Sequence, residues 1–321
     1  MKHLFCIALS LATGSLALTD CSGGATTFHQ QVLPQSWRVQ VGAASADQAL
    51  QGLAFYPSST LTIDAGDAVM WSFPSGEPHT VALLGTGQTA PPPPTDPNSS
   101  KPAGGTSYDG TTFTSSGFKL LGASYSLRFT KAGTYAVYCL IHQPEMVQTI
   151  VVQNAGDAYP HPQSFYDTAG STALGNDLAA ATASLTTFPF GVGSLHLVAG
   201  IAPGSPSGTP STATVLRFLA TTDVSNQTTT VTAGSTVTWT NYSNNEPHTV
   251  TFAPFGQPFP KLNPFGPPTG GNTYDGTTLV SSGPLFPGQS FSITFPTAGS
   301  FVYHCLFHDD TENMVSTLVV K

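Results

Sequence analysis

Charged side chains are scarce in this sequence. Asp, Glu, Lys and Arg make up 8% of its 321 residues, and 9 basic residues stand against 17 acidic ones. The formal net charge is −8, so the chain lacks the basic face with which a protein contacts the phosphates of nucleic acids. We therefore expect no nucleic-acid partner.

Long hydrophobic runs are also missing after the N-terminus. No later stretch has the roughly 18 uninterrupted apolar residues of a membrane-spanning helix, so we expect no membrane span. The N-terminus itself combines Lys2 with a mostly apolar segment, Leu4–Leu18, that ends in the small-residue pattern Ser15-Leu16-Ala17. We interpret residues 1–20 as a signal peptide. The protein is then expected to be extracytoplasmic, whether periplasmic, on the cell surface or secreted.

The sequence has only four cysteines, Cys6, Cys21, Cys139 and Cys305. Cys6 lies inside the predicted signal peptide. Cys21 follows it, and a lipid anchor at Cys21 is an alternative that the sequence leaves open, although Asp20 stands where a bacterial lipobox has a small residue. Cys139 and Cys305 lie in the same local context in different halves of the chain, which favours metal ligands over a disulfide.

The two halves of the chain repeat each other. The 14 residues Gly104–Gly117 recur as Gly270–Gly283 with ten identities, at an offset of 166 that also maps Cys139 onto Cys305. A period this long indicates duplicated domains rather than a solenoid. We predict a first domain over 28–155, a linker over 156–189 with one short helix near 176–185, and a second domain over 190–321.

Short runs of alternating apolar and polar residues predict β-strands in both halves. Examples are Leu61 and Ile63, Val69 and Trp71, Tyr125 to Phe129, and Phe291 to Phe295. Ala-Gly and Pro-Gly turns separate these runs, as in antiparallel sandwiches. The Pro-rich inserts at 91–94 and 258–268 are expected to form surface loops. The predicted fold is all-β, with two tandem Greek-key β-sandwich domains.

Each half carries the same set of potential metal ligands in the same order. The motifs are Cys139-x2-His142-x3-Met146 and Cys305-x2-His308-x5-Met314, and a Glu-Pro-His motif lies far upstream of each. Two imidazoles, a thiolate and a weak thioether form the ligand set of blue-copper electron-transfer sites, whereas zinc prefers four strong ligands. The predicted ligands are His79, Cys139, His142 and Met146 for site one, and His248, Cys305, His308 and Met314 for site two.

With these motifs the chain resembles the cupredoxins, specifically the plastocyanin-like family of small blue copper proteins, over both halves. The resemblance implies cupredoxin-like sandwiches, two type 1 copper ions per chain, and exchange of single electrons with extracytoplasmic redox protein partners. It also implies that His142 and His308 present their ring edges to solvent through an apolar patch, where electrons enter and leave. The ligand loops differ from the familiar plastocyanin spacing, one residue shorter in site one and one longer in site two.

Two other functions stay open. In two-domain nitrite reductases and multicopper oxidases, a His beside the ligand Cys connects a type 1 copper to a catalytic copper, and His304 occupies that position beside Cys305. The chain has no His-x-His pair, which oxidases use at the catalytic copper. We therefore interpret His304 as a structural surface residue and the protein as an electron carrier rather than an enzyme. A copper storage or delivery protein would use the same ligands.

Acidic residues lie close to both sets of ligands. Glu77 and Glu246 precede the prolines before the two upstream histidines, and we interpret them as supporting or surface residues. Asp309, Asp310 and Glu312 follow His308, and we expect them to form a solvated acidic rim that could steer a basic partner.

Overall fold

A computed structural model describes residues 33–190, 195–205, 211–220, 224, 228–244 and 246–321. The predicted signal peptide, Cys21 and the first residues of the predicted first domain lie outside the described residues. Within the described part, no helix is long and apolar enough to cross a membrane.

Most of the regular structure is extended, and one helix accounts for the rest. The first half contains β1 (Ser36–Ala44), β2 (Leu50–Tyr56), β3 (Leu61–Asp64), β4 (Ala68–Phe73), β5 (Ala82–Leu83), β6 (Pro102–Ala103), β7 (Ser107–Tyr108), β8 (Thr114–Ser116), β9 (Ala123–Phe129), β10 (Gly133–Tyr138) and β11 (Val147–Gln153). After helix α1 (Gln163–Thr187) come β12 (His196–Ile201), β13 (Ala213–Leu219), β14 (Thr228–Val231), β15 (Thr236–Tyr242), β16 (Thr251–Phe252), β17 (Val280–Ser281), β18 (Ser290–Thr294), β19 (Gly299–His304) and β20 (Val315–Val320). The all-β fold class is thereby confirmed.

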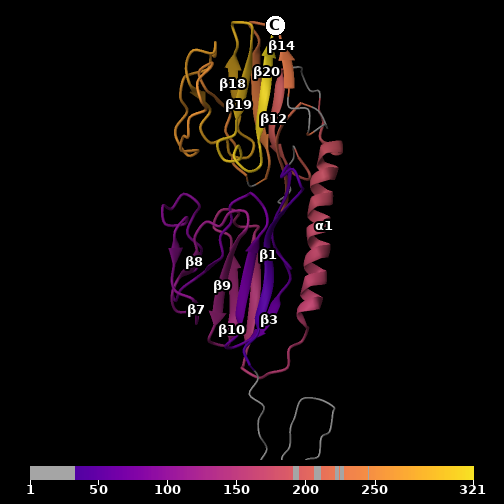
Figure 1. Ribbon diagram of the computed structural model, residues 1–321, viewed down its shortest axis with the longest axis vertical. Coiled ribbons are helices and arrows are strands. Elements are labelled where there is room, and N and C mark those ends of the chain that lie inside the picture. The colour runs from indigo at the N-terminus through magenta and orange to yellow at the C-terminus, as the bar shows by residue number, and fades with distance from the viewer. Residues whose placement is uncertain (1–32, 191–194, 206–210, 221–223, 225–227, 245) are drawn as a thin grey trace, which may run out of the picture.

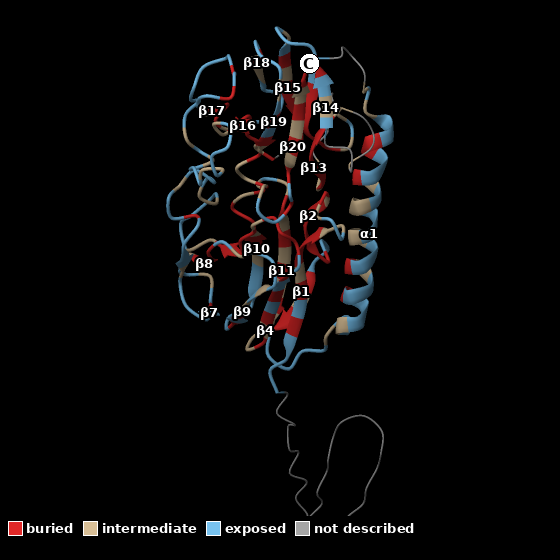
Figure 2. Ribbon diagram, turned by 45° about the horizontal axis from the view of Figure 1, so that its top comes forward, coloured by how far each residue is buried: buried red, intermediate tan, exposed pale blue. Residues whose placement is uncertain are grey.

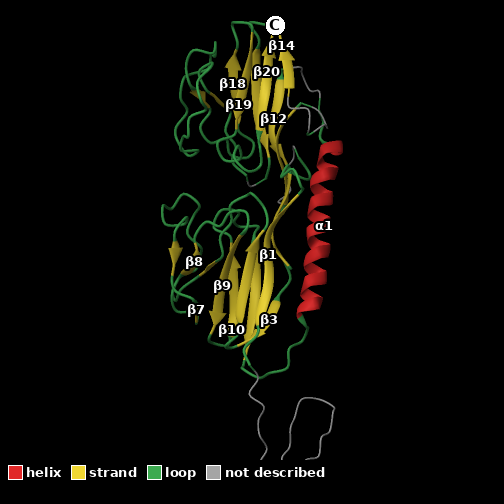
Figure 3. Cartoon of the chain, in the orientation of Figure 1, coloured by secondary structure: helices red, strands yellow, loops and turns green. Residues whose placement is uncertain are grey.

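The strands build two β-sandwiches that lie end to end (Figures 1 and 3). In the first sandwich, strands β2-β1-β4-β9 form one layer and β3-β11-β10-β5-β8 the other. In the second, β13-β12-β15-β18 and β14-β20-β19-β16-β17 form the corresponding layers, strand for strand. Strands β1 and β4, and strands β3 and β11, are parallel neighbours that are not consecutive in the chain, so the connections cross between layers as in Greek-key sandwiches.

Alternation along the strands explains the two cores. In β4, Val69, Trp71 and Phe73 are buried while Met70 and Ser72 are exposed, because successive side chains of a strand point to opposite faces. Trp71 pairs across the sheet with Tyr125 of β9, and the equivalent Trp239 of β15 pairs with Phe291 of β18. Both tryptophans are fully buried, one in each core. Buried residues continue through the junction of the two sandwiches (Figure 2).

One layer of each sandwich belongs to a single nine-stranded sheet. Strand β2 of the first half pairs antiparallel with β13 of the second, through Leu50↔Val215, Gln51↔Thr214 and Gly52↔Ala213. Because β2 and β13 are equivalent strands, their antiparallel pairing relates the two halves by an approximate two-fold rotation, as in an isologous dimer. The same ends of the two sandwiches therefore face each other. The repeat in the sequence did not predict this pairing.

Helix α1 covers the shared sheet. It spans 25 residues, far more than the short helix predicted near 176–185, and packs on β1, β2 and β13. At Gly170 the helix comes close to β2, since a Cβ there would lie 3.1 Å from the carbonyl carbon of Tyr56. Asp177 accepts hydrogen bonds from the Tyr56 hydroxyl (2.6 Å) and from the Thr212 hydroxyl (2.9 Å). The helix thus fastens both halves.

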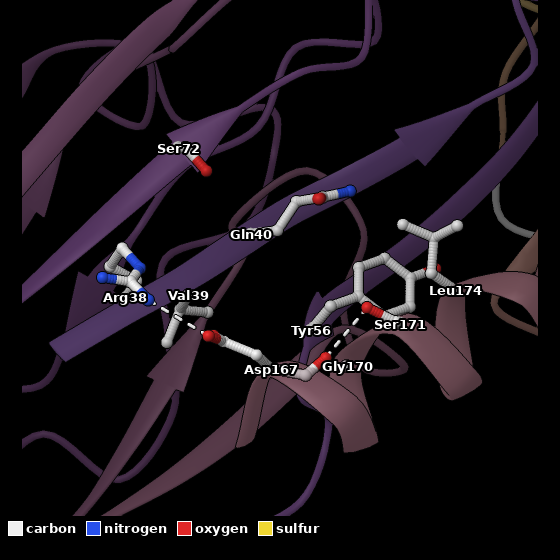
Figure 4. A pocket seen from close by; sticks show the side chains of 9 residues that line it. All are labelled: Arg38, Val39, Gln40, Tyr56, Ser72, Asp167, Gly170, Ser171 and Leu174. Carbon is white, nitrogen blue, oxygen red and sulfur yellow. Dashed lines mark hydrogen bonds and ion pairs between the residues drawn. The ribbon is translucent and has the colours of Figure 1, made fainter. Parts of the chain in front are cut away.

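An open pocket of about 300 Å³ lies between α1 and strands β1 and β4 (Figure 4). At its rim Arg38 and Asp167 form an ion pair of 3.0 Å, with both side chains about half exposed. Such a pair stabilises a protein by at most about 1 kcal/mol, because water screens it. None of the metal ligands predicted from the sequence lines this pocket.

Candidate metal centres

The ligands of site one lie at the end of the first sandwich that meets the second. Cys139 directly follows β10, His142 lies in the loop after it, and Met146 precedes β11. The backbone of His79 is held by two hydrogen bonds to Lys119, from His79 N–H to Lys119 O (3.0 Å) and back (2.8 Å). His79 thus joins a segment that carries the other three predicted ligands, and all four residues are at most 1% exposed.

The nitrogen and sulfur atoms of site one converge. The Cys139 Sγ lies 3.4 Å from Nδ1 of His142 and 3.8 Å from Nδ1 of His79, and the two Nδ1 atoms are 3.0 Å apart. The main chain closes the loop, because Cys139 N–H donates to Met146 O (3.1 Å) and Met146 N–H donates to His142 O (2.9 Å). Two imidazole nitrogens and a thiol sulfur around one point are donors that suit copper.

Site two repeats this geometry in the second sandwich. The Cys305 Sγ lies 3.3 Å from Nδ1 of His308 and 3.7 Å from Nδ1 of His248. Met314 is fully buried, its N–H donates to His308 O (2.8 Å), and its carbonyl accepts from Cys305 N–H (3.0 Å). The loop between His308 and Met314 is two residues longer than the equivalent loop in site one. Within it, Asn313 adopts a left-handed backbone conformation with a φ of 55°.

Two threonines support the cysteines, and the sequence analysis missed them. The backbone N–H of Thr80 donates to the Cys139 Sγ at 3.4 Å, and Thr249 does the same for Cys305. The Thr80 and Thr249 hydroxyls accept from the N–H groups of Leu140 and Leu306, each at 2.7 Å. An N–H donor to sulfur stabilises the thiolate form. Both threonines follow the upstream His in an identical Glu-Pro-His-Thr-Val motif, which was the available signal.

Two glycines make room for the upstream histidines. Gly42 lies in an irregularity of β1 with a φ of 72°, and a Cβ there would overlap with the His79 ring. Gly200 lies in the equivalent irregularity of β12 with a φ of 77°, and a Cβ there would overlap with the His248 ring. Each ligand ring therefore occupies space that only glycine leaves open.

The electrostatics of site one favour an ionised thiol. Burial alone would raise the pKa of the Cys139 thiol, but the facing imidazoles of His142 and His79 hold that pKa well below its ordinary value. Burial would lower the pKa of His142, but Glu246 and Cys139 raise it well above its ordinary value. A thiolate is the form of cysteine that binds a metal.

The expected exposure of the downstream histidines is wrong. His142 is fully buried and His308 is 1% exposed, because the two ligand-bearing ends face each other across the junction instead of facing solvent. The Nε2 atom of each ring points at carboxylates. His142 Nε2 lies 3.0 Å from Glu246 and 3.4 Å from Glu77, and His308 Nε2 lies 3.1 Å from Glu77 and 3.7 Å from Glu246.

The acidic rim is also different from the expectation. Asp309 and Asp310 lie at or near the surface, but Glu312 is buried at the junction, where its carboxylate lies against Gly76 of the first half. Arg217 of β13 donates to the backbone oxygens of Glu312 and of Asp47, so it joins the Glu312 loop to the β1–β2 turn of the first half. Glu312 is therefore a junction residue.

The burial of Glu312 predicts a pH-dependent stability. Burial and the nearby Glu77 carboxylate raise the pKa of Glu312 to about 7. The folded chain thus binds more protons than the unfolded chain between about pH 4.5 and 7, so stability decreases as pH rises through that window. In the metal-free protein, Glu312→Gln is expected to remove a decrease on the order of 2 kcal/mol between pH 5 and pH 8, measured by urea unfolding. An equally steep decrease in the variant would contradict this role.

His304 lies apart from these centres. Its ring stacks on Phe259 at a centroid distance of 3.7 Å, and its Nδ1 lies 3.3 Å from Asp309. A catalytic copper would need further histidines. Among the described residues, the groups able to hold a metal contain neither His304 nor the other two histidines outside the predicted sites, His161 and His196. His29 lies outside the described residues.

The first half of the chain matches a known protein family. Residues 41–153 match the copper binding proteins of the plastocyanin/azurin family. Among solved structures, a Cu(I) form of an amicyanin variant is 21% identical, and the match covers 37% of this chain and 82% of that one with a TM-score of 0.25. A purple cupredoxin from Nitrosopumilus maritimus is 18% identical, over 39% of this chain and 98% of that one, with a TM-score of 0.24. No curated protein matches the chain.

The family match and the geometry agree on the first half. The matched residues include all four predicted ligands of site one; the fold brings donor atoms of His79, Cys139 and His142 to one buried point, and Met146 is buried at the end of the same loop. Two imidazoles, a thiol and a thioether are donors that suit copper. Over residues 41–153, the chain is therefore similar, in sequence and in its set of candidate donor groups, to the copper binding proteins of the plastocyanin/azurin family.

Proposed function

We propose that this protein is an exported blue copper protein that carries single electrons through one type 1 copper in each sandwich. The observation that carries the proposal is the repeated cluster of two Nδ1 atoms and one Sγ within 4.8 Å of one another, with a buried Met at the end of each loop. A structural role for the cysteines alone would not require the same four residues twice.

The ligands would be His79, Cys139, His142 and Met146 in the first sandwich, and His248, Cys305, His308 and Met314 in the second. Copper bound there would supply a one-electron couple between Cu(II) and Cu(I). The chain's part is to hold one geometry for both states. The strand ends, the loop hydrogen bonds and the Thr80 and Thr249 contacts fix the donor atoms before any metal arrives.

Redox protein partners outside the cytoplasm would supply and accept the electrons. Because His142 and His308 are buried at the junction, such a partner would dock on a face other than the ring edges of these histidines.

The test is to load the protein with Cu(II) and measure the copper content, the visible spectrum and the number of electrons taken up. We expect two coppers per chain, an intense blue absorption, and reversible uptake of two electrons. Three coppers with turnover of nitrite or oxygen would replace the proposal by a copper oxidoreductase. Exchangeable Cu(I) without a stable Cu(II) form would replace it by storage or delivery.

A further inference from the structure

Two buried glutamates lie between the two downstream histidines. Glu77 comes from the first sandwich and Glu246 from the second, and they are 2% and 1% exposed. The carboxylate nearest to His142 is that of Glu246, and the carboxylate nearest to His308 is that of Glu77. Each histidine is thus approached most closely by a carboxylate of the opposite sandwich.

The orientation of the rings decides what these contacts do. The Nδ1 atoms of His142 and His308 face the sulfur atoms, at 3.4 and 3.3 Å, so Nδ1 is the nitrogen available to a metal. The neutral ring then carries its proton on Nε2, the atom that faces the carboxylates. The contacts with His142 are ion-pair contacts at 3.0 and 3.4 Å, and a negative carboxylate beside the outer nitrogen of a ligand histidine increases the basicity of that ring as a ligand.

The contacts form a continuous chain between the two sulfur atoms. From Cys139 Sγ it runs through His142 to Glu77, across that carboxylate to His308, and on to Cys305 Sγ, with steps of 3.4, 3.4, 3.1 and 3.3 Å. A second branch through Glu246 has steps of 3.0 and 3.7 Å at the histidines. All of these residues are buried, so the branches run through protein rather than water.

Among the described residues, both carboxylates form their ion pairs with the two downstream histidines. Two like charges that share a buried space repel each other unless cations balance them. In the described part of the chain, the ion-pair partners of Glu77 and Glu246 are His142 and His308, which are the ligand residues themselves. The glutamates are therefore placed to act on the two metal sites and not on a separate ion pair.

We propose that the two copper sites form one coupled pair, in which Glu77 and Glu246 position His142 and His308, lower the reduction potential of the copper in the opposite sandwich, and connect the sites for electron exchange inside the chain. This inference rests on the proposed function. In the exchange, one site is oxidised by one electron while the other is reduced by one electron. No bond forms or breaks, and the Nε2 protons stay in place.

The first experiment measures potentials one site at a time. In a Cys305→Ser background, which removes the site-two thiolate, Glu246→Gln is expected to favour Cu(I) at site one at least tenfold. That change corresponds to a rise of about 59 mV for a one-electron couple. Glu77→Gln is expected to have the smaller effect there, because its contact with His142 is longer. In a Cys139→Ser background, where site two is measured, Glu77→Gln is expected to have the larger effect on the potential and Glu246→Gln the smaller one.

Asp310→Asn is the matched control. It removes one negative charge from the site-two loop, but Asp310 is 81% exposed and points to Lys261. We expect it to change the ratio of Cu(I) to Cu(II) at either site by less than twofold. If Glu246→Gln and Glu77→Gln move the potentials no more than this control does, the glutamates only fill the junction and the inference is wrong.

The second experiment follows electron exchange directly. One electron per chain is delivered rapidly to the fully oxidised protein, and the absorption of the two sites is followed in time. We expect a first-order redistribution whose rate is independent of protein concentration and falls at least tenfold in the Glu77→Gln, Glu246→Gln double variant. A rate proportional to protein concentration would mean that exchange occurs between molecules, which overturns the coupling.

Three outcomes of these experiments are distinguishable from one another. A third metal ion per chain that is lost in the double variant would make the glutamates ligands, and would overturn the proposal. Absence of a blue Cu(II) form in the unaltered protein would refute the proposed function itself. Two blue coppers with unchanged potentials and unchanged exchange in the variants would refute only the coupling.

Discussion

Replacing Cys139 by Ser is expected to remove about half of the blue absorption of the copper-loaded protein, because the intense visible band of such a site comes from the copper–thiolate bond. The hydroxyl of serine is a far weaker soft donor, so the remaining absorption would belong to site two. Cys139 is fully buried and its Sγ is the atom on which the two Nδ1 atoms converge. The measurement is the visible spectrum together with the copper content per chain.

Cys305→Ser is the matched control, because it makes the same change at the equivalent position of the other sandwich. It is expected to remove the other part of the band, and the two difference spectra should add up to the whole. An unchanged spectrum in either variant would exclude that sulfur as a ligand. Loss of the whole band in Cys139→Ser, with the β-sheet circular dichroism retained, would mean that site two depends on site one.

The clusters of candidate ligands were predictable because the residues that form them lie mostly in one short segment of each half. A strand that ends at Cys139, a loop of two residues to His142 and a strand that begins after Met146 must bring these residues to one end of a sandwich. Only His79 comes from a distant segment, and its repetition as His248 in the same five-residue motif marked it. The alternating strands were predictable for the same reason, since the period of two needs only neighbouring residues.

The junction was not predictable, because it depends on contacts between the halves. The residues of β2 and β13 carry no pattern that predicts the pairing of these two edge strands. The apolar residues beside His142 fit a patch for an external partner as well as they fit a contact with the second sandwich. The repeated Glu77 and Glu246 were visible in the sequence, but their role depends on the two-fold arrangement that brings each to the opposite histidine.

The glycines of β1 and β12 were missed for a different reason. Gly42 and Gly200 lie in strands without a recognisable turn motif, and their offset is 158 rather than 166. Their importance comes from the ring that packs against them, which is supplied by a residue far along the chain. A sequence pattern shows which residues are small, but not which of them face a ligand.

Gly42→Ala is therefore expected to disable site one while the sandwich survives. The new Cβ would overlap with the Nε2 end of the His79 ring and with the Ser75 hydroxyl, and alanine would also have to adopt a φ of 72°. The His79 ring cannot retreat easily, because its backbone is fixed on both sides by Lys119. We expect copper affinity at site one to fall roughly 10- to 100-fold, the range found when support of a metal ligand is lost. The backbone strain is expected to cost about 1–3 kcal/mol of stability.

Gly122→Ala separates the two effects. Gly122 has a φ of 81°, so alanine suffers similar backbone strain there, but a Cβ at that position meets no atom within 4 Å. Its stability should fall by a similar amount while both coppers bind normally, as judged by titration with Cu(II) and by the visible spectrum. If Gly42→Ala retains full affinity at site one, the His79 ring does not depend on the space at Gly42. If Gly122→Ala loses a copper as well, backbone strain rather than the ring contact controls the site, and the same reasoning would then fail for Gly200 and His248.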